Sequence, residues 1–438
     1  MKQLASLLFL LTISLPVMGA NLLETYQQAK ANDPGWRAAQ ASRLAGVERA
    51  PQGRSLLLPT LGLSAATSES DQQVIMPSTN NNYRYGTDSY NILLTQPLYR
   101  KQNFAAYAQG IAGANIAEHE FELARQDLIL RATLAYFDVL AAQDVLDFAV
   151  TEKEAVGRQL ALARRNFAVG SATLVDVHEA QARYDLVAAQ QITAANDLEV
   201  RKEALRALIG TAPTALARLE SRLELQPPDP ADMEQWVQTA TVQSPRIKAQ
   251  QETLEIARQE VERNSGGHYP TLDLTASRAW SDAGGSVQGF AIESTTNQIG
   301  LQFQVPLYQG GGIASRVREA TARLEETSQR LDQVRREVVQ RTREAYLAII
   351  NGMARVRALE QARLSNERAL ESTVIGYERG LRTGVDVLNA QRELFRTRRD
   401  LSQARYDYLI SRLRLKTAAG VLQEQDLEDI NRLLAHKQ

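Results

Sequence analysis

Apolar residues recur every seven positions over long stretches of the chain. From Ile313 to about Tyr377 there is no proline. One series of sevens there is Val317, Leu324, Leu331, Val338, Ala345, Gly352 and Leu359. A sustained repeat of seven is typical of coiled coils with a left-handed supercoil. At about 1.5 Å per residue this stretch predicts a helix of about 100 Å. Similar segments at about 103–167, 174–208 and 387–422 predict three further long helices.

Shorter segments alternate between apolar and polar residues and predict β-strands. Leu272, Leu274 and Ala276 share one face, and Ile299, Leu301, Phe303 and Val305 share another, each opposite polar residues. The first half has weaker versions at 61–65 and 90–94. About ten alternating residues suffice for a tilted strand to cross a bilayer. The loops at 71–85 and 282–294 hold Pro, Asn, Gly and Ser and are expected to be turns in water.

The chain repeats itself at a period near 210 residues. Pro34, Pro59 and Pro97 match Pro245, Pro270 and Pro306, at offsets of 211, 211 and 209. The segments around Gly170 and Gly380, and then Gly210 and Gly420, match at 210. We therefore expect one unit used twice, each a helix, a β-hairpin, a long helix and another helix. The opening helices are expected at about 22–53 and 233–263.

Five segments follow from this repeat. Residues 1–20 combine Lys2, a short apolar run and small residues, which predicts a secretory signal peptide. The first repeat is expected at 21–210, an equatorial linker at 211–230, the second repeat at 231–420 and an equatorial tail at 421–438. After the signal, no stretch approaches the roughly 18 apolar residues of a membrane-spanning helix. If the chain crosses a bilayer, it does so with strands.

Four strands cannot close a transmembrane barrel by themselves, because the smallest such barrels have about eight and lipid does not tolerate open edges. Membrane strands would therefore require several copies. Two, three or four copies would give 8, 12 or 16 strands, and the arithmetic does not choose among them.

The amino-acid composition argues against nucleic-acid binding, metal binding and catalysis. Lys+Arg is 50 and Asp+Glu is 51, for a net charge of −1, so no basic field is available to attract nucleic acid. The chain has no Cys, and its 4 His residues lack helical metal-ligand spacing. We therefore expect no catalytic residues, no metal site and no cofactor, hence no enzyme.

Four segments carry a resemblance to a known family. They are His268–Ser277, Val305–Gly311, Gly380–Gln391 and Ala404–Leu409. They resemble the TolC-like outer membrane efflux proteins, in order and over nearly the whole mature chain. The resemblance implies a mainly α fold with a small β part. Long antiparallel coiled-coil helices would form a periplasmic tunnel, and four transmembrane strands per chain would close as a 12-stranded barrel in a homotrimer.

The resemblance also implies location and partners. The protein would lie in the outer membrane of a Gram-negative cell, in contact with outer-membrane lipid, and extend into the periplasm. It would be the exit duct of tripartite drug efflux or type I protein secretion. A periplasmic adaptor (membrane fusion) protein and an inner-membrane transporter would be its partners, and cargo would depend on them.

A gate is expected where Gly170, Gly380 and Gly384 interrupt the helices at the end remote from the strands. Asp176 and Asp386 follow these glycines at equivalent places in the two repeats. With threefold symmetry each would form a ring of carboxylates that favours cations. Arg382 has no counterpart in the first repeat and is positioned to pair with Asp176 of a neighbouring coiled coil.

The resemblance adds to this gate. It implies that Tyr377, Arg382 and Asp176 hold the entrance closed and that Asp386 belongs to an acidic constriction. Some relatives carry an Asp where this chain has Asn389, so weaker cation block is expected. The alternative for both aspartates is an ordinary N-terminal charge favoured by the helix dipole.

Two other classes of protein remain open on the residues alone. One is a periplasmic coiled-coil adaptor or scaffold without a pore, which would need a compact domain of many short strands. The other is a soluble helical enzyme, disfavoured because no nucleophile, base or metal constellation is present.

Overall fold

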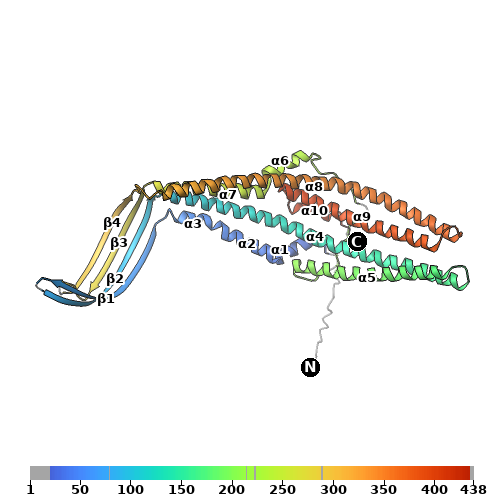
Figure 1. The fold of residues 1–438 in the computed structure, drawn as a ribbon, viewed down its shortest axis with the longest axis horizontal. Helices are drawn as coiled ribbons and strands as arrows, with labels where there is room; N and C mark the ends of the chain where they lie inside the picture. The colour runs from blue at the N-terminus through green and yellow to red at the C-terminus, as the bar shows by residue number, and fades with distance from the viewer. Residues whose placement is uncertain (1–19, 78, 214, 221–222, 288–289, 435–438) are drawn as a thin grey trace, which may run out of the picture. The chain divides into compact units, whose positions relative to one another are not determined.

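A computed structural model describes residues 20–77, 79–213, 215–220, 223–287 and 290–434 (Figure 1). The expected signal peptide lies almost wholly outside the described residues. The chain divides into two compact units. Unit 1 comprises Met1–Ala38, Ala124–Ser244 and Val338–Gln438, and unit 2 comprises Ala39–Leu123 and Pro245–Glu337. Each unit therefore takes segments from both expected repeats.

Helices dominate the chain, as predicted. The four long ones are α4 (Lys101–Ala168), α5 (Leu174–Ile209), α8 (Gly312–Glu378) and α9 (Gly384–Ala419). The short ones are α1 (Leu22–Asn32), α2 (Pro34–Val47), α3 (Arg49–Ser55), α6 (Met233–Gln243), α7 (Pro245–Ser265), η1 (Gly266–His268) and α10 (Gln425–Asn431). None of the helices in the described ranges has the length and apolar character needed to cross a membrane.

The expected single helices at 22–53 and 233–263 are wrong, because each is broken. Asp33 and Ser244 have ψ of 119° and precede Pro34 and Pro245. A residue before proline is driven out of the helical region, so α1 and α6 end there and α2 and α7 begin at the prolines. The first segment breaks once more, at Glu48.

Unit 2 contains one antiparallel sheet in the order β1-β2-β3-β4 (Figure 1). Its strands are β1 (Thr60–Met76), β2 (Thr79–Tyr99), β3 (Thr271–Ala283) and β4 (Ile292–Gln304). The expected loop at 71–85 is wrong, since the ladder continues through Asp71↔Arg84 to Met76↔Thr79. Cross-strand hydrogen bonds satisfy the backbone there, so polar side chains that face water on both sides do not prevent the strand.

Most apolar residues of the sheet gather on one face, which also carries Arg278 opposite Ile92, and several of them are exposed. Facing pairs are Leu61↔Leu94, Leu63↔Ile92, Leu274↔Leu301 and Leu272↔Phe303. Ile299 is 75% exposed, Phe303 66% and Leu61 72%. Tyr90 stacks on Trp280 with 5.2 Å between the ring centroids. This pair lies at one end of the band formed by the apolar residues of this face. From Leu272 to Trp280 the band measures about 27 Å along the strand.

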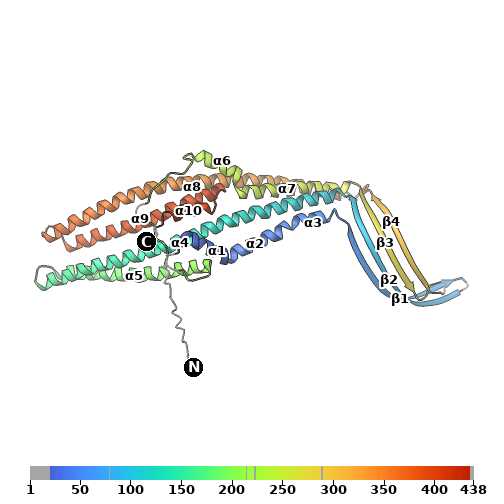
Figure 2. The ribbon, with the colours of Figure 1, turned by 180° about the vertical axis from the view of Figure 1, so that it is seen from behind.

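In unit 1, α4 pairs with α5 and α8 with α9, and both connecting turns lie at the same end of the unit (Figure 2). Segments expected to form the linker and tail meet beside these helices. The Leu219↔Leu434 bridge joins them, and Tyr408 Oη donates to the Gln226 carbonyl at 2.8 Å. Ala20 bridges Leu216 in parallel.

Candidate functional site

The two helix turns of unit 1 are built alike. Gly170 and Gly380 have φ of 75° and 72°, a left-handed conformation that glycine adopts without steric cost. After each glycine the chain closes on the preceding helix: Ser171 N–H donates to the Asn166 carbonyl and Leu381 N–H to that of Gly376, both at 2.8 Å. This is the Schellman pattern of helix ends. It explains why glycine stands at both positions.

The next helix begins with a capping box in both turns. Thr173 N–H donates to Asp176 Oδ2 at 2.8 Å, while Asp176 N–H donates to Thr173 Oγ1 at 3.2 Å. Thr383 and Asp386 make the same pair of bonds at 2.9 and 3.2 Å. These reciprocal bonds satisfy helix N–H groups that would otherwise lack partners.

Both carboxylates are held in the charged form. The side-chain bond from Thr173, together with its backbone N–H, lowers the pKa of Asp176. The backbone and side-chain bonds from Thr383, with the nearby charge of Arg382, lower the pKa of Asp386. Asp176 and Asp386 therefore cap their helices, as the helix-dipole alternative expects, and they also bring negative charge to the end of the unit.

A pocket of about 510 Å³ lies between the two turns. Its walls include Asp176, Tyr377, Arg382 and Gly384, together with Gln159 from α4. A Cβ at Gly384, the first residue of α9, would lie 3.3 Å from Gln159 Nε2. The structure thus brings most of the expected gate residues to one cavity. Gly170, Asp386 and Asn389 do not line it, and Asn389 is exposed on α9.

The contacts of Arg382 and Tyr377 were not evident from sequence. Asn166 Nδ2 donates to Tyr377 Oη at 3.2 Å and so joins α4 to α8. Arg382 N–H donates to the Gly376 carbonyl at 3.2 Å. Among the described residues of this single chain, no ion pair joins Arg382 to Asp176.

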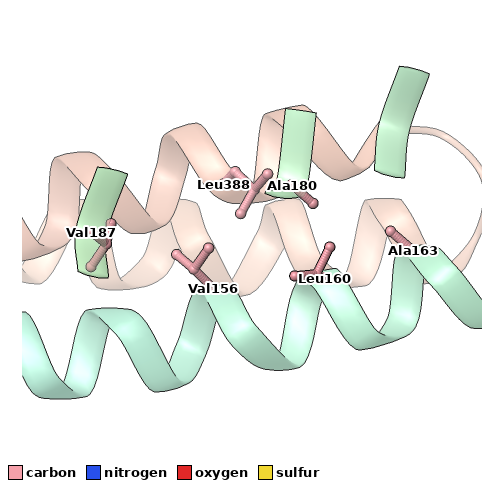
Figure 3. Packing of buried hydrophobic residues seen from close by; sticks show 6 residues of the cluster. All are labelled: Val156, Leu160, Ala163, Ala180, Val187 and Leu388. Atoms are coloured by element: carbon pink, nitrogen blue, oxygen red, sulfur yellow. The ribbon is translucent and has the colours of Figure 1, made fainter. Parts of the chain in front are cut away.

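Hydrophobic packing ties the two helix pairs together behind the pocket. Val156, Leu160 and Ala163 of α4 contact Ala180 and Val187 of α5, and Leu388 of α9 inserts among them (Figure 3). All six side chains are buried. Leu388 thus belongs to the core of the other helix pair, so separating the pairs would expose apolar surface.

A buried ionic cluster continues this interface. Glu152 of α4 has a side chain only 1% exposed and pairs with Arg183 of α5 at 2.7 Å and Arg399 of α9 at 3.1 Å. Asp144 of α4 accepts from Tyr406 Oη at 2.8 Å. Burial first, and then the Asp144 carboxylate, raise the pKa of Tyr406, which therefore remains a hydrogen-bond donor.

The sequence held a signal for Glu152. It stands between the buried Ala149 and Val156 on the apolar stripe of α4, where a charged residue needs a partner. No comparable signal marks Asn166, because an Asn near a helix end is ordinary. Among the described residues no group of His, Asp or Glu could hold a metal ion.

The fold matches solved outer membrane channels. One is the outer membrane protein VceC of Vibrio cholerae, with a TM-score of 0.79 and 23% identity, covering 91% of this chain and 96% of that one. Another is the CmeC outer membrane channel of Campylobacter jejuni, with a TM-score of 0.81 and 19% identity, covering 95% and 90%. This chain therefore has the fold of these two outer membrane proteins.

Sequence comparison gives the family. The model of the outer membrane efflux protein family matches residues 25–211 and 236–421. Outer membrane protein TolC of Escherichia coli K12 is 34% identical over 95% of this chain and 85% of its own, and that of Vibrio cholerae is 36% identical over 96% and 95%. The alkaline protease secretion protein AprF of Pseudomonas aeruginosa is 33% identical over 96% and 88%. The chain belongs to the outer membrane efflux protein family, and an outer membrane location with a periplasmic part goes with it.

Proposed function

We propose that this protein is the outer-membrane exit duct for tripartite efflux and type I secretion, and that its gate is the pair of helix turns in unit 1. The single observation that carries the proposal is the exposed apolar face of a sheet with two open edges. In water, such a face and such edges would cause aggregation. In a bilayer the same face is lipid-exposed, and its length suits the apolar band of about 25 Å in membrane barrels.

Closure would come from copies of this chain. Edge strands β1 and β4 run antiparallel and are separated by two strands, so β4 of one copy can pair with β1 of the next. Three copies would give the 12-stranded barrel of a homotrimer. The polar face, with residues such as Gln302 and Thr275, would then line the lumen. The stacked Tyr90 and Trp280 would lie at one membrane interface, in contact with lipid.

The gate would use contacts of two kinds. Within one chain, Asn166 and Tyr377 join the two helix pairs. Between chains, the Arg382 guanidinium, which is exposed in one copy, would pair with Asp176 of a neighbour. Asp386 would form the acidic constriction. Because this chain has Asn389 where some relatives carry a second Asp, the constriction would hold one ring of carboxylates and not two. Gly170 and Gly380 would form the turns at which the helices separate.

Cargo and energy would come from partners. The relatives AprF and PrtF carry the names alkaline protease secretion protein and proteases secretion protein. An inner-membrane transporter and a periplasmic adaptor would supply the driving force and the connection, and the duct itself would perform no catalysis. The adaptor or scaffold alternative is not supported, because the family and the structural relatives are outer membrane channels.

The proposed chain organisation has a signal peptide at 1–20 and two repeats at 21–210 and 231–420, with the linker and the tail at the equator. The paired family matches support this division. Planar bilayer recording of the purified full-length chain tests the function. We expect discrete conductance steps and recovery of the protein in the outer-membrane fraction. A water-soluble periplasmic protein that adds no conductance would contradict the proposal.

A further inference from the structure

A second pocket lies in unit 2, where the helices meet the sheet. Its volume is about 450 Å³, within the usual range for small-ligand sites. It is lined by Leu56, Gln102, Asn103, Ala106, Arg263, Asn264, Gly267 and Arg316. The lining therefore combines two guanidinium groups and three amides with no carboxylate.

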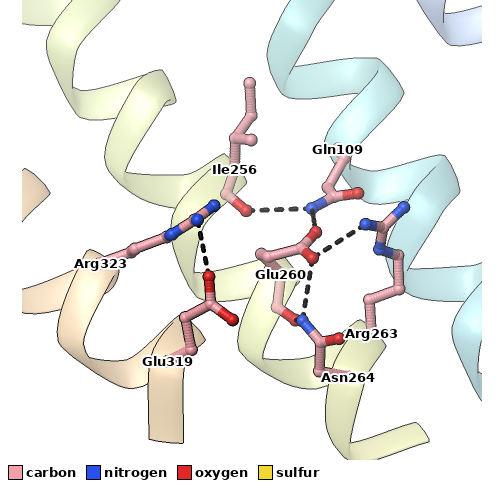
Figure 4. Close-up of polar contacts among 7 residues, drawn as sticks. All are labelled: Gln109, Ile256, Glu260, Arg263, Asn264, Glu319 and Arg323. Carbon is pink, nitrogen blue, oxygen red and sulfur yellow. Dashed lines mark hydrogen bonds and ion pairs between the residues drawn. The ribbon is translucent and has the colours of Figure 1, made fainter. Parts of the chain in front are cut away.

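Arg263 is held in place by a network of polar contacts (Figure 4). Its Nη2 donates to Glu260 Oε1 at 2.8 Å, and Gln109 Nε2 and Asn264 Nδ2 donate to the same carboxylate at 2.9 and 2.8 Å. Burial alone would raise the pKa of Glu260, but these bonds outweigh it and lower the pKa. Glu260 is thus a fixed anion that orients Arg263 and leaves its other donors available.

Arg316 of α8 has no such counter-charge. The carboxylate three residues on, Glu319, pairs with Arg323 at 2.6 Å instead (Figure 4). In the part of the chain that the structure describes, no ion pair or hydrogen bond of the Arg316 side chain is found. Arg263, Arg316 and Glu260 together leave one net positive charge at the pocket.

The residues around the pocket are of the kinds found at membrane interfaces. Gly267 lies five residues before Leu272, where the apolar band of β3 begins, and Tyr269 lies between them, about 10 Å from Leu272. Lys101 packs 4.2 Å over the Tyr269 ring while pairing with Glu262 at 2.9 Å. Exposed apolar side chains surround the same junction: Leu56, Leu58, Leu98, Tyr99, Phe104, Leu307 and Tyr308. Aromatic rings and cations beside an apolar band are typical of the headgroup region.

We propose that this pocket binds the phosphodiester of a phospholipid in the periplasmic leaflet, with Arg263 and Arg316 as its ligands. This inference rests on the proposed function, because that function puts the sheet in the membrane. A phosphodiester carries one negative charge, which matches the net charge of the pocket, and guanidinium groups bind phosphate oxygens in bidentate geometry. The exposed apolar side chains nearby would contact the acyl chains.

Native mass spectrometry of the full-length chain in detergent micelles tests this site. The probe is dimyristoyl phosphatidylglycerol, compared with dimyristoyl glycerol, which lacks the phosphate. We expect one phosphatidylglycerol molecule to bind per chain, and to bind more tightly than dimyristoyl glycerol. Arg316→Ala should weaken that binding about tenfold, the effect of losing one charge-assisted hydrogen bond. Arg318→Ala, also exposed on α8 but outside the pocket, should leave it unchanged.

Three results would overturn the inference: equal binding by the Arg316 and Arg318 variants, equal binding of the two lipids, or full displacement of the lipid by millimolar inorganic phosphate, which would indicate a small-anion site. Far-ultraviolet circular dichroism checks that each variant folds, and Arg316→Gln serves as a second variant. Lipid binding in micelles needs no pore. A chain that conducts without binding lipid contradicts this inference alone, whereas one that binds lipid without conducting contradicts the proposed function alone.

Discussion

Removal of the Tyr377 hydroxyl tests the gate with the smallest change. Tyr377→Phe deletes the acceptor of the 3.2 Å bond from Asn166 and keeps the ring that packs near Gly384. This bond joins α4 to α8, so its loss weakens the connection between the two helix pairs. We expect the open state of the channel to be populated more often.

The magnitude follows from the geometry. A neutral, half-buried hydrogen bond of this length contributes about 1 kcal/mol. If the bond exists only in the closed state, its loss raises the ratio of open to closed states about fivefold. Single-channel recording in planar bilayers measures this ratio directly. The current through a fully open channel should not change, because the substitution removes no lumen charge.

A double-mutant cycle makes the test specific. Asn166→Ala should have a similar effect, and the double variant should add little, because both changes remove the same bond. Tyr184→Phe on α5 is the matched control, since no hydrogen bond of its hydroxyl is found among the described residues. If Tyr377→Phe and Tyr184→Phe give the same open fraction, or if the two changes at the bond are additive, the reasoning is refuted.

Three further predictions also concern unit 1. Glu152→Gln leaves two arginines beside a neutral amide in a buried interface, so the free energy of unfolding should fall by about 3 kcal/mol, measured by chemical denaturation; the exposed Glu154→Gln should have little effect, and equal losses would contradict the buried cluster. The lowered pKa values of Asp176 and Asp386 mean that their capping contribution is complete above their ordinary pKa of 3.8 and is lost as the pH falls through the lower value of the folded state. A Thr173→Ala, Thr383→Ala double variant should therefore be less stable at pH 7, and the difference from the parent should become smaller as the pH falls below 3.8, although the bonds from the Asp N–H groups to the Thr hydroxyls are lost at every pH; a stability difference that does not change with pH would count against the capping boxes. Asn389→Asp should strengthen block of the channel by a trivalent cation, whereas Gln190→Glu on the exposed side of α5 should not; no difference between them would remove Asn389 from the constriction.

Long helices were predictable because their signal is local. An apolar repeat of seven residues in a stretch without proline predicts a long helix from neighbouring residues alone. The observed bounds of α4, α5, α8 and α9 lie within a few residues of those expected. The breaks at Asp33 and Ser244 were also present in the sequence, as residues before proline. They were missed because the apolar pattern continues across them.

The strands were less predictable. Residues such as Asp71 and Arg84 face each other across β1 and β2, and polar side chains facing water on both sides give no alternation of apolar and polar residues. Pairing between β1 and β2 extends both strands well beyond the apolar band, and such pairing cannot be inferred from neighbouring residues alone.

The gate shows the same division between local and non-local information. The turns at Gly170 and Gly380 and the Thr-Asp capping boxes after them can be predicted from sequence, because each depends only on neighbouring residues. The Asn166–Tyr377 bond joins residues 211 positions apart. Nothing near either residue indicates the other, and only packing of the helix pairs brings them together.

Pairing of β4 with β1 of another copy is the central claim, and disulfide cross-linking tests it most directly. The chain has no native Cys, so Ser64→Cys on β1 can be combined with single cysteines at each position of β4 in turn. Within one chain, β2 and β3 separate these strands. Oxidation in outer membranes should give covalent species of up to three chains, at alternate β4 positions only. Monomers at every position would contradict a shared barrel.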